Sequence, residues 1–487
     1  MLKATLRSAV LLGLLVWSVP GFAEVQNVKV GGDITVRSFW RRNLTLTRAA
    51  AGTNGQTAAQ AAAQSGNFLS QTTGLNVGAD LTENVSAFLR LTNEADWASN
   101  LNTVSSRSDI AVSQSYITLK ELFYSPLTVK IGRQPIVWGR GFVLGSNLLP
   151  GVNLRGDDLH AAIVANEFTD FTAFDGIRAT LDLSGVAGLG VPLIVDGVYV
   201  KLNEGNTFAG DDVSLLGINI GTHFDTMGGE LETYYLNKRD KAGNVAFTSF
   251  NKPGSVSTLG VRGSVKPVQG AYAYGELAYQ FGRRGLDAAN ILRSGDAQQA
   301  WAFDLGVDYT AKDVAWTPKA GVEWVFYSGK DSEACAASTA ATAYCGGVAG
   351  WDPIARGYFS TALREFQTNT NVAGFYANSQ NGTTTAATNQ HQFSLYGSLK
   401  PLEDLTIAPR LSWFYLADGI RPIGADGAAA TKKKNYAGTE LDTQVTYNYT
   451  DDVQFGLIYG VFAPGNVYRT PNDAVAQELI SSVSVKF

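Results

Sequence analysis

The sequence predicts an all-β protein, a transmembrane antiparallel up-and-down β-barrel of about 18 strands. Three observations support this: apolar and polar residues alternate with period two, short and long connections alternate, and an export signal precedes the first strand. The alternating segments run for about 10 to 13 residues, the length that a tilted strand needs to cross a bilayer. Soluble strands are shorter, usually about five or six residues.

The N-terminal residues 1–23 have the features of a secretory signal peptide. Lys3 and Arg7 supply positive charge, an apolar stretch follows, and small residues precede the expected cleavage after Ala23. The apolar stretch is too short to span a bilayer as a helix, which disfavours the alternative of a membrane anchor. We therefore expect residues 24–487 to form the exported barrel.

The alternation is clear in the segment that begins at Trp301. Its apolar face comprises Trp301, Phe303, Leu305, Val307 and Tyr309, and its other face Ala302, Asp304, Gly306 and Asp308. Successive side chains of a strand point to opposite faces, so each segment has one apolar face and one polar or small face. Eighteen such segments begin near Val28, Asn67, Val85, Ile110, Leu127, Phe174, Pro192, Ser214, Glu230, Ser255, Ala271, Gln299, Thr317, Asn389, Leu405, Tyr436, Val453 and Ala474.

The connections between these segments favour a membrane barrel over a soluble sandwich. Short turns such as 82–84 and 450–452 alternate with long polar stretches, and outer-membrane barrels have short periplasmic turns and longer external loops. We expect extracellular loops at 43–66, 139–173 and 329–388. Aromatic residues near strand ends are typical of an interfacial girdle: Tyr235, Tyr279, Phe281, Tyr309, Tyr327, Tyr415, Tyr447 and Tyr449.

A sheet in lipid must close on itself, because each unpaired backbone group there costs several kcal/mol. The last segment alternates up to Phe487, which is typical of the strand that the barrel-assembly machinery recognises. About 18 strands enclose a lumen too wide for side chains alone to fill. Either 139–173 or 329–388 folds inward as a constriction, or both lie outside; the sequence leaves these alternatives open.

Composition and charge narrow the function classes. The chain has 52 Gly, 24 Phe, 20 Tyr and 9 Trp, which suits strands with one apolar face, and its net charge of -5 gives no reason to expect nucleic acid as a partner. The cysteines, Cys335 and Cys345, are expected to form a disulfide within one loop of this exported protein. A metal site or a reactive thiol is the alternative, although no His or acidic cluster flanks the pair in a ligand spacing.

Several segments resemble the alginate-export family of outer-membrane porins. Val129 to Gln134 reads VKIGRQ and is followed by WGRG at 138–141; Phe174 to Thr180 and Gly438 to Asp442 also match, and the last leads to FAPG at 462–465. These segments occur in the family's order over nearly the whole chain. The resemblance implies an eighteen-stranded barrel and a role in transport across the outer membrane.

Alternation assigns side chains of both signs to the lumen. The candidate pore-lining residues from alternation are Arg90, Lys130, Arg178, Arg262, Arg410, Glu232, Glu276, Asp304, Glu440 and Asp442. Arg133 and Arg140 are added because they lie at the end of the fifth strand, beside the long loop, where they could line a constriction. A mixed lumen does not concentrate a polyanion. We therefore predict a porin that passes ions or small hydrophilic solutes, with export of an alginate-like polysaccharide as the alternative.

Four of these candidates also have another interpretation, in which the side chain has a structural role or is simply solvated. Arg133 can tie the base of a loop to a neighbouring strand, and Arg178 can pair with Asp175. Glu440 and Asp442 can hold a cation, or can simply be solvated lumen acids.

We expect neither an enzyme nor a cofactor. The histidines, His160, His223 and His391, do not lie in a spacing that pairs a base with a nucleophile. A barrel sheath around a partner such as a cytochrome is a further alternative, although the chain has no Cys-x-x-Cys-His motif of its own. The expected contacts are outer-membrane lipid and the transported solute, and we expect a monomer.

Overall fold

The computed structural model of the chain describes most of the predicted barrel. The described residues are 27–44, 46, 66–97, 110–123, 126–147, 165–185, 191–203, 212–240, 254–283, 297–329, 350–367, 388–421, 430–469 and 473–487. The predicted signal peptide, Cys335 and Cys345 lie outside the described residues.

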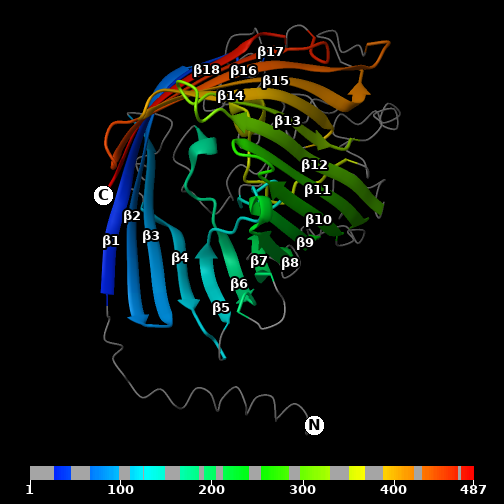
Figure 1. Cartoon of the computed structure of the whole chain (residues 1–487). Helices are drawn as coiled ribbons and strands as arrows, with labels where there is room; N and C mark the ends of the chain where they lie inside the picture. Colours follow the sequence, from blue (N-terminus) through cyan, green and yellow to red (C-terminus); the bar gives the residue numbers. More distant parts are fainter. Residues whose placement is uncertain are drawn as a thin grey trace, which may run out of the picture.

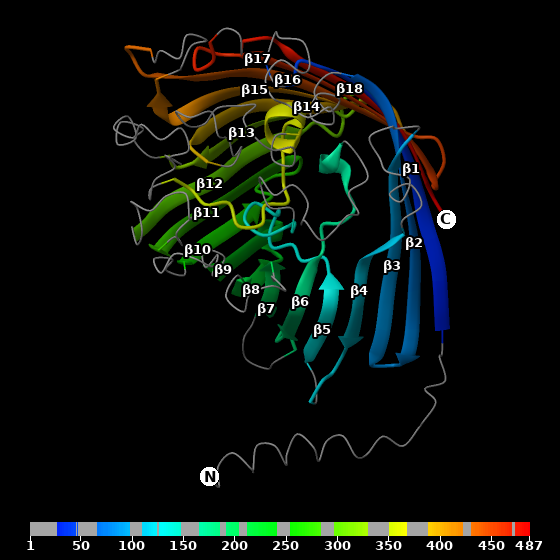
Figure 2. The ribbon, with the colours of Figure 1, turned by 180° about the vertical axis from the view of Figure 1, so that it is seen from behind.

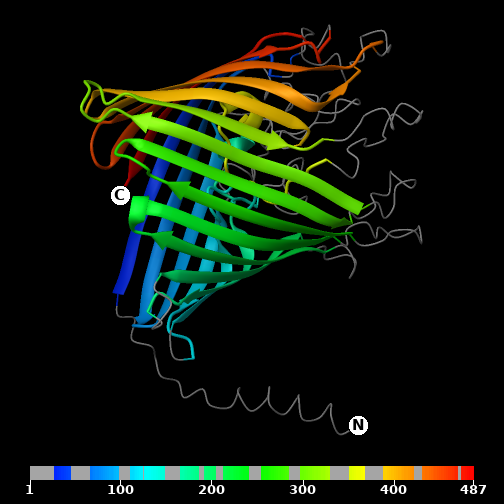
Figure 3. The ribbon, with the colours of Figure 1, turned by 45° about the vertical axis from the view of Figure 1, so that its right-hand side comes forward.

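The strands form one closed antiparallel sheet of 18 strands. Each strand pairs with the strands before and after it in the chain, and β1 pairs with both β2 and β18, which closes the ring (Figures 1 and 3). Closure satisfies the backbone hydrogen bonds of every strand on both sides, as a bilayer requires. The predicted fold class is confirmed.

The strands have the following bounds: β1 (Asn27–Arg42), β2 (Gly66–Thr82), β3 (Val85–Asp96), β4 (Ala111–Leu119), β5 (Leu127–Gln134), β6 (Phe174–Asp182), β7 (Leu193–Asn203), β8 (Val213–Phe224), β9 (Gly229–Asp240), β10 (Gly254–Val265), β11 (Ala271–Arg283), β12 (Ala297–Thr310), β13 (Lys319–Tyr327), β14 (Gln390–Leu402), β15 (Leu405–Ile420), β16 (Lys434–Asn448), β17 (Val453–Pro464) and β18 (Ala476–Lys486). Short helical segments occur in the connections, at η1 (Asn166–Phe168), η2 (Thr226–Gly228) and η4 (Ala362–Gln367). Among the residues that the structure describes, no helix has the length and apolar character needed to cross a bilayer.

Every strand starts within two residues of the position that the alternation predicts. The largest offsets, two residues, occur at β12, β13, β16 and β18. Lengths range from 8 residues in β5 to 17 residues in β2, a wider range than predicted. The longer strands extend beyond the bilayer-crossing length, where alternation fades and the sequence no longer marks the strand end.

Period-two alternation sorts the side chains of β12 as predicted. Trp301 and Val307 are each 47 % exposed on the outer face, and Ala302 and Asp304 are buried on the inner face. The outer face therefore presents apolar side chains to the surroundings of the barrel, and the inner face holds the polar side chains.

Most of the aromatic residues predicted for the girdle lie on the outer face, and one does not. Tyr235, Tyr309 and Tyr447 are exposed there. Tyr327 is instead fully buried inside the barrel and stacks on Phe142, at 5.4 Å between ring centroids. The girdle assignment is wrong for Tyr327, because its position has the same parity as the inward Glu323.

The two ends of the barrel differ. Short turns such as Glu83–Asn84 between β2 and β3 lie at the end where β1 begins and β18 finishes (Figure 3). Gly32 and Phe487 exchange backbone hydrogen bonds of 2.8 and 3.0 Å there, which completes the pairing of β1 with β18. The long connections leave from the opposite end.

Candidate constriction inside the barrel

Three segments of the long connections lie inside the ring of strands. They comprise residues 135–147, 165–173 and 350–367, and Figure 2 shows η4 in yellow and the cyan segment after β5 within the barrel. Their apolar side chains form buried clusters with inward residues of the wall, for example Phe142 with Tyr327 and Leu363 with Phe414. Parts of both long loops singled out in the sequence therefore fold inward, and the alternative in which both lie outside is wrong for these parts.

Segment 135–147 turns sharply at the inner wall. Gly139 and Gly141 have positive φ angles of 56° and 80°, which residues other than glycine rarely adopt. In addition, a Cβ on Gly139 would lie 2.7 Å from the Cδ of Arg262. The Trp138 indole donates to Asp196 of β7 at 2.7 Å. The two glycines thus allow the backbone of this segment to turn and to lie directly against the inner wall.

Segments 135–147 and 350–367 join each other through backbone contacts. Gly145 N donates to Ala355 O at 2.7 Å, Gly357 N donates to Gly141 O at 2.8 Å, and Leu144 forms a parallel bridge with Ala355. A Cβ on Gly357 would lie 2.7 Å from the Cα of Gly145, so the two backbones approach as only glycines permit. The two segments form one unit that narrows the lumen.

Arg140 is the charged side chain that this unit presents to the wall of β11–β13. Its guanidinium lies over the rings of Tyr274 and Tyr358, at 3.7 and 4.3 Å from their centroids. Its nitrogens lie 3.2 Å from Asp304 and 3.5 Å from Glu323. Burial alone would lower the pKa of Arg140, but the tyrosines and Asp304 raise it above its ordinary value, so the side chain stays cationic.

Glu323 connects the constriction to the wall. Its carboxylate accepts hydrogen bonds from Arg410 at 2.6 Å, Tyr274 at 2.7 Å and Tyr358 at 3.2 Å. Burial, and then the charge of Glu323, raise the pKa of the Tyr358 hydroxyl above its ordinary value, so it remains a donor. A charge-assisted network of this kind holds its members in fixed positions.

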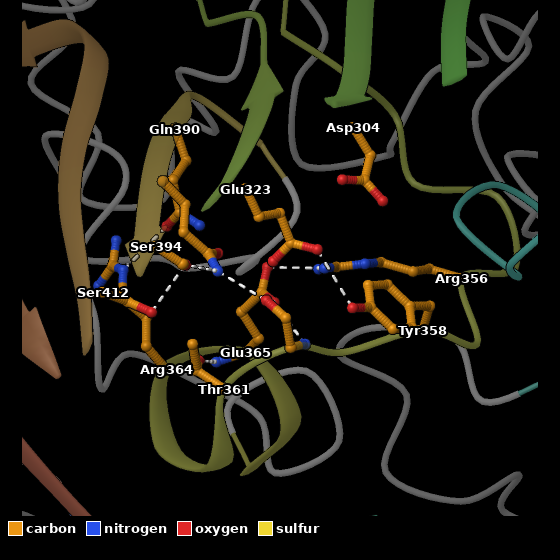
Figure 4. A network of polar contacts seen from close by, with 12 residues as sticks. Asp304, Glu323, Arg356, Tyr358, Thr361, Arg364, Glu365, Gln390, Ser394 and Ser412 are labelled. Carbon is orange, nitrogen blue, oxygen red and sulfur yellow. Dashed lines mark hydrogen bonds and ion pairs between the residues drawn. The ribbon is translucent and has the colours of Figure 1, made fainter. Parts of the chain in front are cut away.

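The segment around η4 is held by buried polar groups (Figure 4). Arg356 donates to Glu365 at 2.6 Å, and Glu365 also accepts from the backbone and side chain of Ser360 at 2.9 Å each. The carboxylate of Glu440 accepts from the backbone N–H groups of Leu363 and Arg364 at 2.7 and 3.0 Å. Glu440 thereby binds the first turn of η4 to β16.

Segment 165–173 attaches to the opposite part of the wall. Asp170 accepts from Arg90 at 2.6 Å and from Thr92 at 2.8 Å, while Arg90 also contacts Asp33 of β1 at 2.7 Å. Fully buried Arg41 bridges Glu167 of this segment and Glu478 of β18.

Two basic side chains on the inner face, one on β1 and one on β5, lie within ion-pair distance of no described carboxylate. Within the part of the chain that the structure describes, Arg37 and Lys130 form no ion pair; Arg37 donates to Thr72 at 3.3 Å, and Lys130 lies over the ring of Tyr116 at 4.7 Å. Charge of both signs therefore faces the lumen: these two cations lie on β1 and β5, and carboxylates such as Glu232 and Glu276 lie on β9 and β11.

One predicted pore-lining residue faces the other way. Arg133 has the same parity as Ile131, which is 42 % exposed on the outer face, and its guanidinium binds Asp175 of β6 at 2.8 Å. The pore-lining assignment of Arg133 is wrong, because parity fixes its face. It ties β5 to β6 beside the loop. Arg178 pairs with Asp196 at 2.9 Å rather than with Asp175.

The structure places the remaining candidates on the inner face or in the constriction: Arg90, Lys130, Arg140, Arg178, Arg262, Arg410, Glu232, Glu276, Asp304, Glu440 and Asp442. Arg262 pairs with Glu232 at 2.6 Å, and Tyr234 donates to Glu276 at 2.7 Å. Glu440 and Asp442 lie against η4, and no cluster of His, Cys, Asp and Glu among the described residues can hold a metal ion.

Sequence reasoning missed several residues of the site. Arg356, Tyr358 and Glu365 lie in a loop without periodicity, so no sequence signal separates them from solvated loop residues. The outward positions of β1 include Ile34 and Trp40, and alternation relative to them indicates that Arg37 faces inward.

An outer-membrane β-barrel channel is the class that this architecture defines: a closed sheet with an apolar outer face, a polar lumen and inward loop segments. The chain belongs to the alginate export family, whose model matches residues 205–482. The fold is similar to that of OccAB1 from Acinetobacter baumannii, at 10 % identity and a TM-score of 0.53 over 96 % of this chain and 98 % of that one. It is also similar to OpdL from Pseudomonas aeruginosa, at 13 % identity and a TM-score of 0.52 over 95 % and 99 %. At these identities the likeness concerns the fold alone, and no curated protein matches the sequence.

Proposed function

We propose that this channel passes ions and small hydrophilic solutes through a polar lumen of mixed charge. The observation that carries the proposal is the environment of Arg140, a cation fixed between two tyrosine rings beside Asp304 and Glu323. Fixed charges of both signs at a narrow point select solutes by size and charge.

The mixed charge of the lumen disfavours the passage of a polyanion. A polyuronate needs a continuous positive path, yet carboxylates such as Glu230, Asp304 and Asp308 line β9–β13. Export of an alginate-like polysaccharide is the second candidate, and membership of the alginate export family favours it.

The orientation follows from the connection lengths. Outer-membrane barrels have short turns at the periplasmic end, so the end with Phe487 and the short turns faces the periplasm and the long connections face outward. We further propose that the barrel acts as a monomer and that the barrel-assembly machinery inserts it.

Solute entry into liposomes tests the proposed function. Purified full chain is reconstituted, and swelling rates are compared for neutral sugars of increasing size, small monocarboxylates, small amines and a short oligouronate. The proposal expects rates that fall steeply with size and differ modestly with charge, and little entry of the oligouronate. Rapid oligouronate entry alongside slow entry of smaller neutral sugars would favour the export function instead.

A further inference from the structure

Two exposed arginines face outward at the end of the barrel where the long connections leave. Arg239 of β9 and Arg283 of β11 both lie in register with Ser255 of β10, one on each side. They share their face with Leu259 and Phe281, which are exposed on the outer surface. One strand, β10, lies between them, so their backbones are two interstrand spacings apart, roughly 10 Å. The long side chains can therefore converge on one ligand above Ser255.

Neutral polar groups complete the patch around Ser255. Asn237 Nδ2 donates to the hydroxyls of Ser255 and Ser257 at 3.0 Å each, and Ser257 shares a hydrogen bond of 3.0 Å with the hydroxyl of Tyr235. Such groups are unusual on a surface that faces lipid tails, so this part of the face lies at the level of polar headgroups.

Aromatic rings lie directly below these groups on the same face. The rings of Tyr279 and Trp301 are 4.3 Å apart between centroids, and those of Tyr279 and Phe281 are 6.1 Å apart. Aromatic belts mark the interface between the hydrocarbon and the headgroups. Acyl chains can therefore contact the belt while their headgroup reaches the arginines.

The charge of the patch is not balanced by an ion pair in the part of the chain described. Two other outward cations at this end of the barrel are neutralised: Arg133 pairs with Asp175 at 2.8 Å, and Lys201 pairs with Asp212 at 3.2 Å. Arg239 and Arg283 form no such pair among the described residues. In the sequence, the connection 241–253 has two lysines and no acidic residue, and the connection 284–296 has two arginines and two aspartates. Paired guanidinium groups suit phosphate because they donate to its oxygens in a planar fork.

We infer that this patch, defined by Tyr235, Asn237, Arg239, Ser255 and Arg283, binds the phosphates of an anionic glycolipid in the outer leaflet of the membrane. The inference depends on the proposed orientation of the barrel. Bound lipid anchors β9–β11 at the membrane surface without entering the lumen.

Native mass spectrometry of the full chain in detergent tests the inference with three probes: diphosphorylated lipid A, the same lipid without phosphates, and inorganic phosphate. The variant R239Q/R283Q removes both charges. The matched control is Arg42→Gln, which removes an exposed outward arginine of β1 at the same end of the barrel as the patch. We expect wild type and R42Q to bind the diphosphorylated lipid, and the double variant to bind it on the order of tenfold more weakly, as the loss of two charge-assisted contacts implies.

Several outcomes would overturn the inference. If the double variant bound the diphosphorylated lipid as tightly as wild type, Arg239 and Arg283 would not be its binding residues. If wild type bound the lipid without phosphates equally tightly, binding would occur without a contribution from the phosphates. Inorganic phosphate that binds as tightly as the lipid would indicate a free-anion site. Channel conductance of the same preparations separates this test from the proposed function, because lipid binding and conduction can fail independently.

Discussion

At the scale of single residues, Arg140 sets the charge of the constriction. Arg140 comes from a loop rather than from the barrel wall, and its guanidinium forms ion pairs with Asp304 and Glu323 of the wall. Its two tyrosine neighbours hold the guanidinium in place, so its charge acts at one fixed point of the lumen.

Arg140→Gln is expected to make the channel more cation-selective. The substitution leaves Asp304 without its ion-pair partner and adds negative potential at the narrow point, so the cation-to-anion permeability ratio should rise roughly two- to threefold, the effect of a potential change near kT. Reversal potentials in a salt gradient measure this ratio. Arg140→Lys keeps the charge and serves as the control; a ratio that changes equally in both variants would contradict the electrostatic account.

Replacement of Arg41 is expected to lower the free energy of unfolding of the barrel. Arg41→Gln leaves the buried carboxylates of Glu167 and Glu478 without their cation, at a cost of about 3–5 kcal/mol. The urea concentration at which the barrel unfolds in detergent measures the loss. The exposed neighbour provides the control, since Arg42→Gln should change the free energy of unfolding by less than about 0.5 kcal/mol; similar losses in both variants would refute the role of burial.

Residue parity explains both the successes of the sequence prediction and its errors at Arg133 and Tyr327. Alternation with exposed apolar residues places Asp304 and Glu276 inward, and the structure has them there. The position of Arg133 next to a loop suggests the lumen, but counting from Lys130 along the strand puts its side chain on the opposite face. Strand parity outweighs proximity to a loop, because the side-chain direction is fixed by the pairing register.

At the scale of elements, the strands could be predicted and the constriction could not. Each strand carries its own signal, since one face meets lipid and the other the lumen. Segments 135–147 and 350–367 are held by contacts that are remote in sequence, such as Gly141 with Gly357 and Glu440 with η4. No local pattern encodes such contacts, so the sequence could name these loops as candidates but could not decide whether they fold inward.

The junction of these two segments gives a prediction at the same scale. Gly357→Ala would place a Cβ 2.7 Å from the Cα of Gly145, so the two backbones must separate. The barrel should remain folded while the constriction loosens, and single-channel conductance should increase or fluctuate. Gly78→Ala is the matched control because nothing lies within 4 Å of its added Cβ. Identical, steady conductance in both variants would show that the junction does not narrow the lumen.

At the scale of the whole molecule, closure of the ring depends on β1 and β18. Phe487 exchanges two backbone hydrogen bonds with Gly32, and its ring lies against that glycine. Removing Phe487 should therefore lower the amount of folded barrel in the outer membrane severalfold, measured by the heat-modifiable band on gels. Lys486→Gln, which keeps the backbone pairing, should leave this amount unchanged. Normal levels after removal of Phe487 would show that the pairing of Gly32 with Phe487 is dispensable.

The central claim is that the barrel is a channel narrowed by its own inward segments. Single-channel recording of the full chain in a planar bilayer, with a salt gradient across it, tests the claim most directly. The account predicts stable openings with weak selectivity or a cation preference, and a conductance well below that expected for an unobstructed ring of 18 strands. Strong anion selectivity, or the absence of any conductance from correctly folded protein, would contradict it.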